Sequence, residues 1–269
     1  MASAIVHDSL VVRHETLTPF RLRAVVCGDA AVGKSALARL AASHGREHPK
    51  SYVCTAQPEW LSLALRVPAA SLPAGAPPCL VDLLLLDAPG SATFNLRDDA
   101  AQRLWQTCRA CALVFDVGSR ESFKNVDRWL LKAQAACGSG AASGGGAGGA
   151  GGAGSAGGAG AGGAAGAGAG PLLVVLVGAK CDLREAGVER AEVSSDEGRA
   201  CAARIGALGY VECSSERGVD VERPFALLAA AWARRLLDER EEDAEADADG
   251  GGGGGGAGGG GGAGTRGRH

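Results

Sequence analysis

Short apolar runs alternate with amphipathic stretches through the first 237 residues of the chain. Six runs have the length and content of β-strands, at 22–27, 60–67, 81–87, 112–117, 172–177 and 210–213. Helical patterns lie between them, at 35–42, 98–108, 122–136 and 194–204, and a terminal helix shows one apolar face with Phe225, Leu228, Trp232 and Leu236. The alternation predicts an α/β fold, in which helices flank a six-stranded, mostly parallel sheet.

Local details refine this prediction. The run 112–117 is apolar almost throughout, which is typical of a strand buried on both faces. The segment 68–79 contains four prolines and a glycine and predicts a loop, so that 60–67 and 81–87 can form a hairpin at one edge of the sheet. Ser194 to Glu197 has the spacing of a helix N-cap with its first turn.

Low-complexity segments set the expected domain boundaries. Residues 138–170 are almost wholly Gly, Ala and Ser, and 250–264 are nearly all Gly. Such segments bury too little to offset the entropy of ordering, so we expect them to be disordered. We expect an N-terminal extension at 1–20, one domain at 21–237 with an insertion at 138–170, and an acidic, then Gly-rich, disordered tail at 238–269. The acidic run 238–249 either extends the terminal helix or forms a solvated tail.

Charge and cysteine content exclude several classes. A formal net charge of −3 gives no electrostatic footprint for nucleic acid. The nine scattered cysteines, without a secretory signal or an apolar membrane span, predict reduced thiols in a cytoplasmic protein. Cys108 and Cys111 form one C-x-x-C with no second pair at zinc spacing. Ala2 excludes N-myristoylation and the final residues hold no prenylatable cysteine, so we expect no direct lipid anchor.

One eight-residue segment carries the strongest chemical motif. It spells G-x-x-x-x-G-K-S and consists of Gly28, Asp29, Ala30, Ala31, Val32, Gly33, Lys34 and Ser35. It lies between a predicted strand and a predicted helix, as a phosphate-binding loop requires. The glycines let backbone N–H groups approach phosphate oxygens, and the helix directs its positive end at the same anion. Lys34 would contact the β- and γ-phosphates, and the Ser35 hydroxyl would bind Mg²⁺.

Further motifs give a family resemblance. The stretch 113–123 (LVFDVGSRESF), followed by Trp129 and Leu130, resembles the Rab branch of the Ras superfamily of small GTPases. Within it, the stretches 51–55 (SYVCT) and 84–91 (LLLDAPGS) are similar to Rab-like GTPases of the intraflagellar transport B complex. The missing C-terminal cysteine agrees with that choice. The resemblance covers residues 21 to about 237 without the insertions, and it implies a P-loop small GTPase fold with GTP or GDP and Mg²⁺ as ligands.

The resemblance implies roles for the switch residues. Thr55, which follows Lys34 by 21 residues, would reach Mg²⁺ and the γ-phosphate. Asp87 and Gly90 match D-x-x-G; Asp87 would hold Mg²⁺ through water, and the Gly90 N–H would meet the γ-phosphate. The family usually has a glutamine after this glycine to orient the attacking water, whereas this chain has Ser91. No catalytic residue is assigned, and we expect hydrolysis at or below the unassisted rate, on the order of 10⁻⁴ s⁻¹.

Base recognition departs from the family once more. Gly178-Ala179-Lys180-Cys181-Asp182 occupies the N-K-x-D position, where Asp182 would accept from guanine and the Lys180 stem would cover the base. Ala179 replaces the usual asparagine, which should weaken binding roughly ten- to hundredfold. Cys213-Ser214-Ser215-Glu216 fits the weaker S-A-K motif, in which Ser214 and Ser215 would contact the base.

Three hypotheses follow from these motifs. The first is a guanine-nucleotide-binding subunit of the intraflagellar transport machinery, slow in hydrolysis and located in the cytoplasm and the cilium or flagellum. The resemblance implies that it pairs with a small β-sandwich subunit and other proteins of the transport complex. The second is a lipid-independent trafficking Rab GTPase. The third, suggested by Ser91 and Ala179 together, is a nucleotide-insensitive scaffold.

Overall fold

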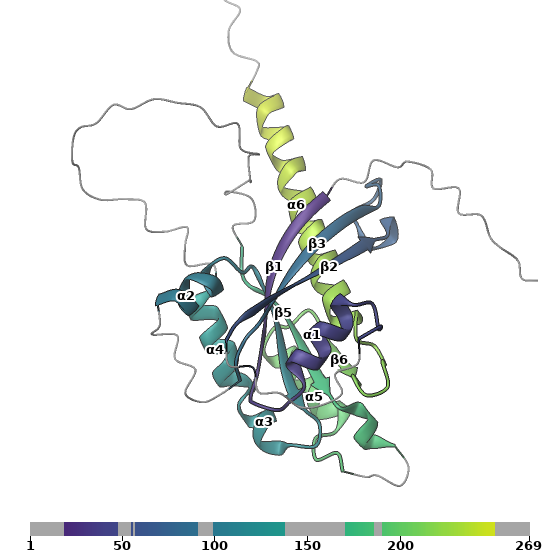
Figure 1. Cartoon of the computed structure of the whole chain (residues 1–269). Helices are drawn as coiled ribbons and strands as arrows, with labels where there is room; N and C mark the ends of the chain where they lie inside the picture. Colours follow the sequence, from purple (N-terminus) through teal and green to yellow (C-terminus); the bar gives the residue numbers. More distant parts are fainter. Residues whose placement is uncertain are drawn as a thin grey trace, which may run out of the picture.

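A six-stranded sheet forms the centre of the molecule (Figure 1). The computed structural model describes residues 19–47, 55, 57–90, 99–137, 170–185 and 190–250. The strands are β1 (Pro19–Cys27), β2 (Glu59–Val67), β3 (Cys79–Asp87), β4 (Ala110–Asp116), β5 (Leu173–Ala179) and β6 (Tyr210–Cys213). Their order is β2-β3-β1-β4-β5-β6; β2 runs antiparallel to β3, and all other neighbours are parallel. The predicted fold class and edge hairpin are therefore confirmed.

Helices cover both faces of this sheet. They are α1 (Lys34–Ala42), α2 (Asp99–Gln106), α3 (Arg120–Lys124), α4 (Val126–Ala136), α5 (Ser195–Arg204) and α6 (Arg223–Gly250), with short 3-10 turns η1 (Ala69–Ser71) and η3 (Cys181–Arg184). Helices α1 and α6 pack against strand side chains in one core, and α2, α4 and α5 do so in the other. Each sheet face is thus buried against helices, as parallel sheets require.

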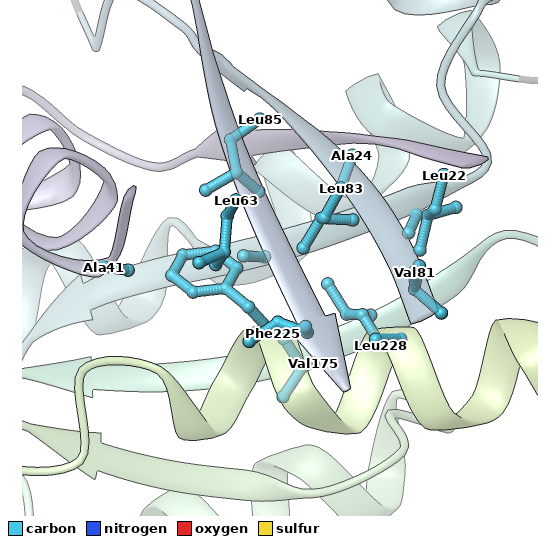
Figure 2. Close-up of a cluster of buried hydrophobic side chains, with 14 of the residues drawn as sticks. Leu22, Ala24, Ala41, Leu63, Val81, Leu83, Leu85, Val175, Phe225 and Leu228 are labelled. Carbon is cyan, nitrogen blue, oxygen red and sulfur yellow. The ribbon is translucent and has the colours of Figure 1, made fainter. Parts of the chain in front are cut away.

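The core beneath α1 and α6 is built from alternate strand positions. Figure 2 shows Leu83 and Leu85 of β3 beside Leu63 of β2, with Phe225 and Leu228 of α6 reaching toward them. All of these side chains are at most 1% exposed, so their apolar area is removed from water almost completely. The terminal helix is therefore an integral part of the domain.

The helices differ from the sequence prediction in two places. The helix expected at 122–136 is two helices, because the Ser119 side chain caps the Ser122 N–H to start α3 early, and a new helix begins after Asn125. Helix α6 continues through the acidic run to Gly250, so that run extends the helix instead of forming a separate tail. The Ser194–Glu197 capping box is confirmed. Most of the Gly/Ala insertion, residues 1–18 and residues 251–269 lie outside the described residues.

Candidate nucleotide-binding site

The predicted site residues gather at one edge of the sheet, where the parallel strands end. The loop of residues 28–33 follows β1, Gly90 follows β3, Lys180 and Asp182 follow β5, and Ser214 and Ser215 follow β6. The strand order brings these ends together because β1 lies between β3 and β4 and β5 lies next to β4. Open α/β sheets bind ligands at this edge, near the strand where the order reverses direction.

The phosphate loop depends on unusual backbone conformations. Gly28 has φ +147°, and a Cβ at this position would overlap the carbonyl oxygen of Val114 in β4. Gly33 has φ +108° and leads directly into α1, while Ala31 adopts a left-handed φ of 62°. Glycine is therefore required at both ends of the loop, and the first turn of α1 points at the space that the loop encloses.

Lys34 lies in the centre of this arrangement. Its side chain is only 5% exposed, and Nζ donates to the Asp29 carbonyl oxygen at 2.6 Å. Gly90, in the turn after β3, lies against the same atoms: a Cβ built there would be 2.5 Å from the Asp29 carbonyl oxygen, and closer still to Lys34 Nζ. The D-x-x-G turn therefore packs on the phosphate loop, with room for a backbone N–H but none for a side chain.

Three oxygen-bearing side chains meet beside Lys34. The hydroxyls of Ser35 and Thr55 are 2.7 Å apart, and the Thr55 hydroxyl donates weakly to Asp87 Oδ2 at 3.4 Å. Asp87 is fully buried, and its Oδ1 has no hydrogen-bond partner among the described residues. Burial raises the pKa of this carboxyl, although Ser35 and Lys34 oppose the shift. An orphaned carboxylate oxygen next to two hydroxyls fits a hard cation such as Mg²⁺, which takes oxygen ligands.

The other end of the site contains the four residues predicted to contact the base, which are Lys180, Asp182, Ser214 and Ser215. Asp182 Oδ1 accepts from the hydroxyl of fully buried Ser214 at 2.5 Å, so the carboxylate is held by the residue that follows β6. Lys180 has φ 63°, and its Nζ forms an ion pair with Asp116 Oδ2 at 2.6 Å. Ser215 follows and is half-buried. Asp116, which the sequence analysis did not single out, therefore orients the lysine.

Ala179 lies between the two ends of the site. It is 4% exposed, and its methyl group is 3.7 Å from the position of a Cβ on Gly33. An asparagine amide at this position would extend toward the start of α1, whereas the alanine ends at its methyl group. The alanine that replaces the family's asparagine thus lies at the contact between the base end of the site and the phosphate loop.

A set of contacts to Asp29 was missed by sequence reasoning. Asn125 Nδ2 and Trp129 Nε1 each donate to its carboxylate at 2.7 Å, and Arg128 pairs with it at 3.3 Å. Trp129 was recognised only through the family resemblance. An indole N–H and an amide one helical turn apart indicate a shared acceptor, but the sequence does not say which one.

Several other predictions have plain outcomes. Ser91 lies outside the described residues. Cys108 is buried, and burial raises its pKa to about 12. Its partner in the C-x-x-C, Cys111, has its Sγ 3.4 Å from that of Cys27 instead.

Across the part of the chain that the structure describes, no group of three or more His, Cys, Asp or Glu side chains could hold a metal, and no helix is long and apolar enough to span a bilayer.

Comparison with known proteins extends these observations. Over 113 residues, 42% of this chain, it is 32% identical to an intraflagellar transport protein 27 homolog of Homo sapiens. It is 34% identical over 115 residues to intraflagellar transport protein 27 of Chlamydomonas reinhardtii. The match spans about half the length of these relatives, at 55% and 52%. Ras-related protein Rab-42 of Mus musculus is 26% identical over 214 residues, 79% of this chain and 77% of the relative.

The resemblance to Rab-like proteins inferred from the motifs is confirmed by these relatives. The Ras family matches residues 23–142 and 168–234, which include every strand of the sheet except the first residues of β1. The match is interrupted at the Gly/Ala insertion, as expected for an addition to an existing domain. The chain belongs to the Ras family.

Proposed function

We propose that this chain is a Rab-like, guanine-nucleotide-binding subunit of the intraflagellar transport machinery, with slow GTP hydrolysis. The observation that carries the proposal is the convergence at one sheet edge of the phosphate loop, the Ser35–Thr55–Asp87 oxygens and the Asp182 carboxylate. Membership of the Ras family supports guanine nucleotide as the ligand.

The residues of the chain have complementary roles at the phosphates. The N–H groups of residues 29–35 and the start of α1 provide donors and a partial positive charge, and Lys34 adds a full one. Ser35 and Thr55 would hold Mg²⁺ directly, and Asp87 would hold it through water; the ion supplies charge neutralisation at the phosphates. Because Lys34 lies on the Asp29 carbonyl, it is held at the loop and needs little rearrangement to meet an anion.

Guanine selectivity depends on Asp182. A carboxylate can accept from both N–H donors on the guanine edge, whereas adenine does not offer this pair of donors and would forfeit these hydrogen bonds. The Ser214 hydroxyl holds this carboxylate in place, and the Lys180–Asp116 ion pair holds the lysine stem that would cover the base. Alanine at position 179 lacks the amide that would hydrogen-bond both the base and the phosphate loop. The affinity for guanine nucleotide is therefore lower, while the preference for guanine over adenine is kept.

Slow hydrolysis is part of the proposal. Ser91 is too short to orient a water as the usual glutamine does, and the side chain of Ala30, two residues after Gly28, would take space near the γ-phosphate. In a single-turnover assay the parent should hydrolyse GTP at or below a rate on the order of 10⁻⁴ s⁻¹, and Ser91→Gln should be faster. A parent that is already fast would show that another residue positions the water.

The cellular assignment comes from the relatives. Two of them are named as intraflagellar transport proteins, which supports association with a cilium or flagellum and with other subunits of the transport complex. Pairing with a small β-sandwich subunit is proposed from the resemblance of the motifs alone. Isolation of the native complex from ciliated cells, followed by identification of its members, tests this part. Recovery with transport subunits supports it, while recovery only with vesicle-trafficking proteins favours the alternative, a trafficking Rab.

The nucleotide carried by the purified protein tests the central claim. Denatured protein should release GTP or GDP, and Lys34→Ala should release none, because the buried ammonium at the loop is lost. Lys124→Ala, at an exposed lysine of α3, is the matched control and should release as much as the parent. A folded parent that neither carries nor binds guanine nucleotide in saturating Mg²⁺ would favour the scaffold hypothesis instead.

A further inference from the structure

The Asp29 carboxylate lies behind the phosphate loop and is held by α4. Its Oδ2 accepts from Asn125 Nδ2 at 2.7 Å, and its Oδ1 accepts from Trp129 Nε1 at 2.7 Å. Arg128 adds an ion pair to Oδ1 at 3.3 Å, and only 20% of the Asp29 side chain is exposed. Hydrogen bonds to a charged acceptor are about twice as strong as neutral ones. The loop is thereby joined to a helix about 100 residues away in sequence.

The backbone of the same residue faces the proposed phosphate site. The Asp29 carbonyl oxygen accepts from Lys34 Nζ, and its peptide bond to Ala30 lies against Gly90. The loop also includes Ala31 at φ 62°, a left-handed conformation that is unfavourable for a non-glycine residue. Strained residues persist where the surroundings fix them. Asp29 fixes the loop in this way, because its side chain is held by α4 and its backbone carbonyl is held by Lys34.

We propose that Asn125 and Trp129, assisted by Arg128, are positioning residues for the nucleotide phosphates. They hold Asp29, and through Asp29 they keep the Asp29–Ala30 peptide and Lys34 in the geometry that grips the phosphates. The proposal rests on the proposed nucleotide-binding function. It also gives α4 control over how long a nucleotide stays bound.

A packing role alone is the competing explanation for Trp129. The residue is 1% exposed and belongs to the core beneath α2, α4 and α5. Trp129→Phe keeps most of the ring but removes the N–H that Asp29 accepts. Trp105→Phe makes the same change at a fully buried residue of the same core cluster and is the matched control for lost volume. If Trp129 acts only by packing, Trp129→Phe and Trp105→Phe should have similar effects; if it positions Asp29, only Trp129→Phe should change nucleotide release.

The release of the fluorescent nucleotide mant-GDP from the Mg²⁺-loaded protein measures this control. Trp129→Phe and Asp29→Ala should each release it about tenfold faster than the parent, the factor expected for one charge-assisted hydrogen bond. Trp105→Phe should lower Tm but leave the rate unchanged. In an Asp29→Ala background, Trp129→Phe should add nothing further, because its acceptor is already gone. An undiminished effect of Trp129→Phe in that background would overturn the proposal.

Hydrogen exchange in the absence of nucleotide gives an independent readout. The amides of residues 29–34 should exchange faster in Asp29→Ala and Trp129→Phe than in the parent and in Trp105→Phe, whereas those of β1 should not change. Equal exchange in all four proteins would overturn the positioning role. Should the parent fail to retain any guanine nucleotide, the proposed function fails, and the exchange experiment still decides whether α4 orders the loop.

Discussion

A methyl group at Gly90 is a sharp test of the site geometry. In the Gly90→Ala variant, the added Cβ would lie 2.5 Å from the Asp29 carbonyl oxygen and 2.6 Å from the Ala30 nitrogen, with Lys34 Nζ closer than either. Carbon atoms essentially never approach backbone atoms this closely, so the turn after β3 and the phosphate loop must separate. Overpacking of this kind costs about 1–3 kcal/mol, which corresponds to roughly ten- to hundredfold in affinity if the separated loop no longer fits the phosphates.

Calorimetry with Mg²⁺ and either GDP or a non-hydrolysable GTP analogue measures this loss. Both affinities should fall, and the triphosphate should lose more, because the Gly90 N–H is expected to meet the γ-phosphate. Gly209→Ala is the control, since its nearest neighbour, Leu227 Cδ1, is at an ordinary 3.6 Å. If Gly90→Ala binds the triphosphate as tightly as the parent does, the packing of the D-x-x-G turn on the phosphate loop does not govern binding.

Three further variants test other parts of the structure. Ala179→Asn should tighten GDP binding about tenfold or more by calorimetry, and an unchanged affinity would contradict the role given to this position. Burial raises the pKa of Asp87 above its ordinary value of 3.8, so the folded apo state binds this proton more tightly than the unfolded state does. The contribution of Asp87 to the free energy of unfolding therefore falls as pH rises from 3.8 through the raised pKa. The Asp87→Asn variant should lack this loss, so urea unfolding should show it to be more stable than the metal-free parent at neutral pH. Identical pH profiles of stability for the two proteins would refute the raised pKa of Asp87. The Arg120 guanidinium lowers the pKa of Glu197 to about 2, so Arg120→Gln should return it toward 4.5 in an NMR titration, and a pKa that stays near 2 would assign the effect to the Ser194 cap instead.

Features that depend on neighbouring residues could be predicted from the sequence. The strand–loop–helix arrangement around residues 28–35, the capping box at Ser194 and the six strands each follow from spacing within about ten residues. The structure has all of them, with strand ends that differ by up to three residues from those expected. The antiparallel pairing of β2 with β3 also follows, because a short proline-rich connection joins the two strands. Such features are fixed by local geometry, to which the amino-acid order gives direct access.

Contacts between distant segments could not be predicted in the same way. Asn125 and Asp29 are 96 residues apart, and they meet because β4, which leads into α3 and α4, lies next to β1. The same pairing brings Cys111 to Cys27, which spacing alone had set beside Cys108. The length of α6 was also open, since the acidic run is compatible with a helix or with solvent. Strand order and helix packing, which the sequence implies only indirectly, decide these contacts.

A carboxylate within a phosphate-binding loop is unfavourable in principle, and its orientation resolves the difficulty. Asp29 directs its negative charge toward Asn125, Trp129 and Arg128, away from the side on which Lys34 lies. The face of the loop toward the phosphates is therefore lined by N–H groups and an ammonium, so its field favours an anion. Because α4 neutralises this charge, loss of the N–H of Trp129 should weaken phosphate binding, whereas Ala179→Asn should act at the contact between the base end and the phosphate loop.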